Sequence, residues 1–126
     1  MRLPTPVLLT IAAGSVAYSQ RYHTIDPEGA ATTDDLDAIT GGSVNDLLVI
    51  RVAGDSDIVR VRHNIGVGTD KIILQDGQNA ILAKSASPSF GYKFLLLLRS
   101  ADPGWFEVYR NFPYARPMSF TLLAPA

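Results

Sequence analysis

Apolar and polar residues alternate with a period of two along most of the chain, which is the pattern of short β-strands. The clearest run is Leu47–Val52, where residues on both sides of the alternation are largely apolar. Apolar side chains on both faces are typical of a central strand in a sheet. The short connection that follows contains Gly54, and it predicts a hairpin into a second strand over residues 57–63.

The same alternation predicts further strands on either side of this pair. Four consecutive leucines within residues 93–99 predict a strand buried on both faces, and residues 105–110 are expected to pair with it as a hairpin. Thr33 is expected to cap a short helical turn that Leu36 and Ile39 would pin to the core. The remaining predicted strands cover residues 7–13, 16–26, 71–75, 79–83 and 118–123.

About eight to ten short strands with turn signals between them predict an all-β chain, an antiparallel β-sandwich or barrel-like domain with short turns. We divide this single domain into an N-terminal arm with the first strand (1–15), a β domain (16–110) and a C-terminal arm (111–126). A β-prism or one turn of a trimeric spike also fits the spacing. The apolar run near residue 7 is open to three interpretations, as a strand, an extended arm or a secretory signal, and it is shorter than the roughly 20 residues of a membrane span.

The composition indicates a chain that self-associates. Only 18% of the residues are charged and 47% are hydrophobic, whereas an average soluble domain has about 25% charged residues. Some apolar surface is therefore expected to be covered by another copy of the chain. The formal net charge of -1 excludes a phosphate-binding stripe, so we expect no nucleic-acid partner, and no membrane partner either.

Acidic and histidine residues are the first candidates for chemistry. Asp34, Asp35 and Asp37 form a cluster of the oxygen ligands that calcium prefers, but the glycine and glutamate positions of an EF-hand loop are missing. We therefore favour solvated carboxylates around a turn. His23 and His63 lack the spacing of a zinc or catalytic site, and with no cysteine present we expect neither an enzyme nor a metal or other cofactor.

Basic and aromatic residues offer two binding hypotheses. Arg51, Arg60 and Arg62 would form a basic strip, and we expect aspartates 55 and 57 or a neighbouring subunit to neutralise it. Aromatic rings can stack on sugars, which makes Tyr92 and Trp105 the candidate ligand-facing aromatics. Core or subunit packing is the favoured alternative for both rings.

Four segments together resemble a module of tailed-bacteriophage virion proteins. The module commonly reads TDDLDTI.GG, LLVLR, VVVK and LTLLYDG.NW.E, and the chain has related sequences at residues 33–42, 47–51, 58–62 and 95–105. The resemblance implies a β-structured unit that assembles as a homotrimer within a virion. Because the chain shows neither a shaft nor an enzymatic segment, it is most similar to a small capsid decoration or cement protein.

This interpretation gives expected partners and an expected surface. The partners are other copies of the chain, in a trimer, together with major capsid or tail proteins of the particle. The expected subunit or partner interface comprises Leu95, Leu97, Phe112, Tyr114, Met118, Phe120 and Leu122. The alternative is a tail fibre, spike or baseplate component that recognises host-surface carbohydrate.

Overall fold

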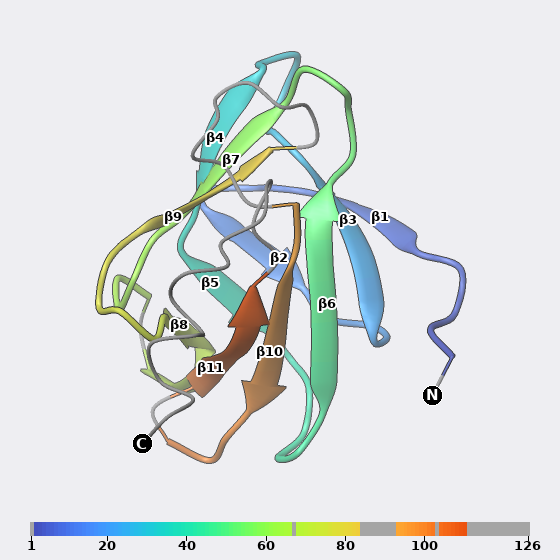
Figure 1. Ribbon diagram of the computed structural model, residues 1–126. Helices are drawn as coiled ribbons and strands as arrows, with labels where there is room; N and C mark the ends of the chain where they lie inside the picture. The colour runs from blue at the N-terminus through green and yellow to red at the C-terminus, as the bar shows by residue number, and fades with distance from the viewer. Residues whose placement is uncertain (1, 67, 84–92, 103, 111–126) are drawn as a thin grey trace, which may run out of the picture.

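The computed structural model describes residues 2–66, 68–83, 93–102 and 104–110, and this part of the chain is all-β (Figure 1). An eight-stranded sheet curls into a nearly closed barrel, with strand order β1-β3-β6-β10-β11-β8-β5-β2, and a three-stranded sheet has the order β4-β7-β9. The predicted fold class, an all-β sandwich or barrel, is confirmed. The strands are β1 (Val7–Thr10), β2 (Ser15–Ala17), β3 (Tyr22–Asp26), β4 (Thr33–Leu36), β5 (Ala38–Thr40), β6 (Leu47–Val52), β7 (Ile58–Val61), β8 (Lys71–Ile73), β9 (Ala80–Ala83), β10 (Leu95–Arg99) and β11 (Gly104–Arg110), and η1 (Gly68–Asp70) is a 3-10 helix.

Parallel pairing is common in this fold, although the sequence predicts antiparallel strands. Among the pairings of the described strands, β1 with β3, β3 with β6, β2 with β5, β4 with β7, and β11 with β8 are parallel. Two connections between the sheets lie one on the other and produce these pairs. The chain passes from the eight-stranded sheet to the three-stranded sheet first from β3 to β4 and again from β6 to β7. As a result, Tyr22 lies opposite Val49 and Thr33 lies opposite Ile58.

The predicted hairpin between residues 47–52 and 57–63 is therefore wrong. Strand β6 is central, as predicted, but its neighbours are β3 and β10, whereas β7 lies between β4 and β9 in the other sheet. The connection near Gly54 turns the chain between sheets rather than between neighbouring strands. Side-chain alternation is the same in both geometries, so the pattern alone does not distinguish them.

The predicted helical turn at Thr33 is also replaced by strands. Strands β4 and β5 occupy this region, and Leu36 and Ile39 are fully buried on either side of the break between them. A break of one residue places apolar side chains three positions apart, which is also the spacing of one helical turn. The single strand predicted over residues 16–26 is likewise divided, into β2 and β3.

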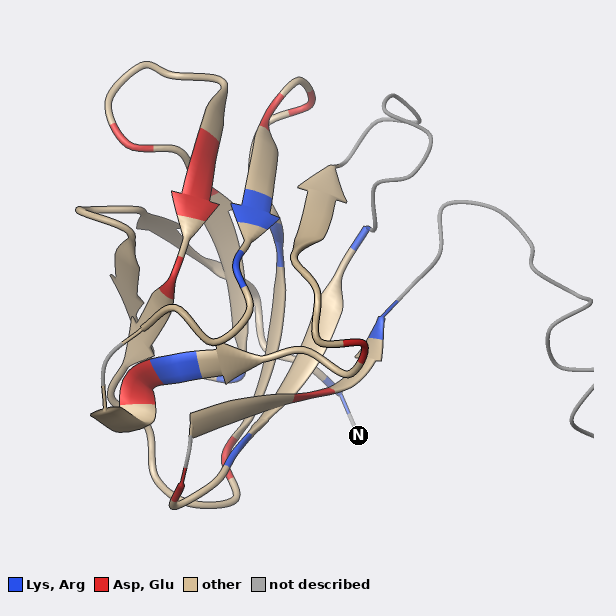
Figure 2. Cartoon of the chain, turned by 90° about the vertical axis from the view of Figure 1, so that its left-hand side faces the viewer, with Lys and Arg blue, Asp and Glu red and all other residues tan. Residues whose placement is uncertain are grey.

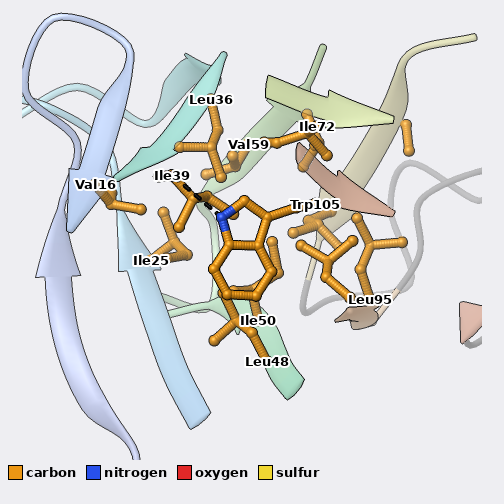
Figure 3. Close-up of a cluster of buried hydrophobic side chains, with 14 of the residues drawn as sticks. Val16, Ile25, Leu36, Ile39, Leu48, Ile50, Val59, Ile72, Leu95 and Trp105 are labelled. Atoms are coloured by element: carbon orange, nitrogen blue, oxygen red, sulfur yellow. Dashed lines mark hydrogen bonds between the residues drawn. The ribbon is translucent and has the colours of Figure 1, made fainter. Parts of the chain in front are cut away.

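Trp105 lies at the centre of the core that both sheets share (Figure 3). Its side chain is 0% exposed, and its indole Nε1 donates a hydrogen bond to the Ile39 carbonyl at 3.1 Å. The Gly41-Gly42 pair brings the backbone against the ring, because both residues have positive φ and a Cβ at Gly42 would lie 2.9 Å from Trp105 Cζ2. The core also contains Leu48 and Leu82 from the two sheets, which are therefore joined by one hydrophobic cluster.

Candidate interaction surface

The four leucines of β10 alternate between the core and the outside of the barrel. Leu95 and Leu97 are fully buried against β6 and β11, so their assignment to an intermolecular interface is wrong. Leu96 and Leu98 are half-buried on the opposite side of the strand. The strand has an apolar outward side, but this side carries Leu96 and Leu98 instead of the predicted Leu95 and Leu97. A shift of one residue exchanges the two faces of a strand.

Neighbouring strands extend this outward side into an apolar surface. Across the sheet, Leu96 lies opposite Val49 and Tyr109, and Leu98 lies opposite Leu47 and Phe106. On β8, Ile73 lies opposite Phe106. We call this surface the outer apolar face, and it comprises Leu47, Val49, Ile73, Leu96, Leu98, Phe106 and Tyr109.

The most exposed members of the outer apolar face are aromatic. The Tyr109 residue is 56% exposed and Phe106 is 39% exposed, while the aliphatic members are half-buried. Phe94 adds a further ring at the border, with its centroid 6.2 Å from that of Tyr109. Its seven members are uncharged, whereas the next outward positions on β6 and β8 are Arg51 and Lys71. Exposed apolar surface of this kind is typical of sites where proteins associate.

A buried ion pair lies on the inward side of β11, where this strand ends. The Arg110 guanidinium donates two hydrogen bonds to the Glu107 carboxylate, and it approaches Asp76 at 3.5 Å. The backbone amide of Gln75 donates to the same carboxylate at 3.0 Å. These contacts hold the end of β11 beside the outer apolar face.

Arg60 on β7 and Arg62 just after it pair with the acidic cluster beside β4, rather than with the aspartates 55 and 57 near the turn (Figure 2). Arg60 donates to both carboxylate oxygens of Asp35 at 2.8 and 2.9 Å, and Arg62 donates to Asp37 at 2.7 and 2.9 Å. The third aspartate, Asp34, instead accepts the amide of Glu28 at 2.8 Å. A cavity of about 470 Å³ lies above β4 and β7, lined by Thr33, Asp34, Asp35, Ile58 and Arg60.

These hydrogen bonds shift the pKa values of Asp35, Arg60 and Arg62. The hydrogen bond from Arg60 lowers the pKa of Asp35 below its usual range, against the opposing effect of burial. The hydrogen bond to Asp35 raises the pKa of Arg60, and that to Asp37 raises the pKa of Arg62. Among the described residues, no three His, Asp or Glu side chains gather as a metal site would require. The arrangement is that of a structural ion-pair ladder between two parallel strands.

Both histidines serve the fold. His23 is fully buried, its Nδ1 lies 2.9 Å from the Val7 carbonyl, and its Nε2 accepts the backbone amides of Ser19 and Gln20. It thereby connects β1 to the loop before β3. His63 Nδ1 accepts the Leu74 amide at 3.0 Å.

The predicted ligand-facing aromatics do not form a platform in the described structure. Trp105 is buried, so its assignment as a ligand-facing ring is wrong, and Tyr92 lies outside the described residues. The predicted interface residues Phe112, Tyr114, Met118, Phe120 and Leu122 also lie outside them. The sequence did not assign Phe106 and Tyr109 to an interface. These residues are three positions apart, and they lie opposite Leu98 and Leu96 because the pairing register shifts between Leu96 and Leu97.

Comparison of the chain with known protein families, with curated proteins and with solved structures finds no match. Within the described part of the chain, no helix has the length and apolar character needed to cross a membrane.

Proposed function

We propose that this chain is a structural protein of a bacteriophage particle, of the capsid decoration or cement type, which assembles as a homotrimer. The outer apolar face is the observation that carries the proposed assembly. The likeness of residues 33–42, 47–51, 58–62 and 95–105 to a virion module supports the proposed location in the virion. In this role the barrel is a rigid support, and function lies in the surfaces it presents to other subunits.

The face favours protein association over carbohydrate binding. Sugar recognition combines a stacked aromatic ring with polar groups that bind the hydroxyls, whereas the two exposed rings of the face have leucine and isoleucine as cross-strand neighbours. Trp105, the strongest stacking candidate in the sequence, is inside the core. Packing of one subunit against another is the use that this chemistry supports best.

Two measurements test the proposal. Light scattering coupled to size-exclusion chromatography should give three times the chain mass of 13.6 kDa, and a monomer at micromolar concentration would refute the assembly. Mass spectrometry and immunogold labelling of purified particles, encoded by the genome that carries this sequence, should place the chain in the virion. Its absence from intact particles would refute the location, whatever its oligomeric state.

A further inference from the structure

The residues that follow Arg110 have a strict alternating pattern over positions 111–122. Even-numbered positions from 112 to 122 carry large side chains, all apolar except Arg116, whereas the odd positions from 111 to 121 are small, polar or proline. An extended segment with this pattern has one apolar side. These even positions are Phe112, Tyr114, Arg116, Met118, Phe120 and Leu122.

This segment begins next to the outer apolar face. Strand β11 ends at Arg110, directly after Tyr109, and the ion pair between Arg110 and Glu107 holds this end in place. Sixteen extended residues reach about 50 Å, whereas four neighbouring strands span about 15 Å. The segment therefore has the length to cross such a face on a neighbouring molecule.

We propose that residues 111–126 of one copy lie extended on the outer apolar face of a neighbouring copy. This inference rests on the proposed homo-oligomer and names the contact that holds it together. The apolar side of the segment covers Phe106, Tyr109 and the outward leucines, and its single charge, Arg116, leaves the interface nearly free of charge. Each copy then gives one segment and receives another, and three such head-to-tail contacts close a ring.

Three variants separate the segment from the face. The first ends at Arg110, and the second keeps the full chain but carries Met118→Lys, Phe120→Lys and Leu122→Lys. The third is the face variant, with Phe106→Lys and Tyr109→Lys. Because both replaced rings are outward and part-exposed, the barrel should tolerate lysine there, and the fluorescence of buried Trp105 reports whether each variant is folded.

A variant at Val44 supplies the matched control. Val44 is 54% exposed, close to the 56% of Tyr109, but it lies outside the outer apolar face. Val44→Lys should therefore leave the oligomer intact in light scattering. Each of the three test variants should be monomeric, with self-association weakened by about 100-fold or more, since several large apolar anchors are lost at once.

Mixing the variants decides whether the contact is between copies. The segment variant has an intact face, and the face variant has an intact segment. Their mixture should form a 1:1 heterodimer through one restored contact, measured by light scattering. If the mixture stays monomeric while both partners are folded, the segment lies on its own chain and the proposal is overturned. If both segment variants still form the oligomer of the full chain, the proposal also fails while the homo-oligomer stands, and a monomeric full chain would instead refute the assembly itself.

Discussion

Truncation of Leu97 to alanine should destabilise the fold far more than the same change at Leu96, its neighbour on β10. Leu97 is 0% exposed and faces the core opposite Leu48, whereas Leu96 is half-buried on the outer apolar face. Leu→Ala in a close-packed core costs about 2–5 kcal/mol through lost transfer energy and the cavity left behind. We expect about 3 kcal/mol for Leu97→Ala and less than about 1.5 kcal/mol for Leu96→Ala, whose side chain loses less burial.

Urea denaturation followed by tryptophan fluorescence measures both changes. Trp105 is the only tryptophan, and because its ring is inside the core, its emission should shift to longer wavelength on unfolding. With a slope of about 2 kcal/mol per molar urea, Leu97→Ala should lower the midpoint by about 1.5 M. Dilution until the midpoint no longer depends on protein concentration separates folding from association. An equal or larger loss for Leu96→Ala at that dilution would refute the assignment of the two faces.

Two further predictions concern a turn and an ion pair. Gly42→Ala should destabilise the fold by about 1–2 kcal/mol because of its left-handed backbone alone, and the contact of the new Cβ with Trp105 should add to this cost. Gly77→Ala is the control, because Gly77 also has a positive φ but open space around its Cβ. In the same urea titration it should lose only the backbone contribution. Replacing Asp35 with asparagine should cost at most about 1 kcal/mol at neutral pH, because water screens a carboxylate that is more than a third exposed. The pKa of Asp35 is lowered in the fold. The difference in unfolding free energy between wild type and variant should therefore be fully present above the ordinary aspartate pKa and vanish as the pH falls through the lowered value. A difference that grows in acid would contradict this pairing.

Much of the strand content can be predicted from the sequence because side-chain alternation is local. The central strand β6 and the hairpin of β10 with β11 follow from apolar runs and a turn signal, and the structure confirms both. The four leucines show the limit of this reasoning. A continuous apolar run has no phase of its own, so the partner strands, rather than the run itself, decide that Leu95 and Leu97 face the core.

The pairing of strands that lie far apart along the chain could not be predicted from the sequence. Arg60 and Arg62 pair with aspartates that lie 25 residues away along the chain, although other aspartates lie much closer in sequence. The reason is that β7 runs parallel to β4, and a parallel neighbour must come from a distant segment. The candidate surface depends on the same kind of information, since Phe106 and Tyr109 join Leu96 and Leu98 only through the register of β10 and β11.

Strand β10 places core residues and outward residues at alternate positions of one sequence. Leu95 and Leu97 fill the core, and Leu96 and Leu98 belong to the outer apolar face. A substitution at an odd position should therefore change the free energy of unfolding at any protein concentration, whereas one at an even position should change chiefly its dependence on concentration. The residues after Arg110 also carry apolar side chains at even positions, except for Arg116. The chain therefore has two alternating patterns, one on the barrel and one on the C-terminal segment. Together they explain why a chain that folds as a barrel has few charges, and why we expect it to associate through its outer surface.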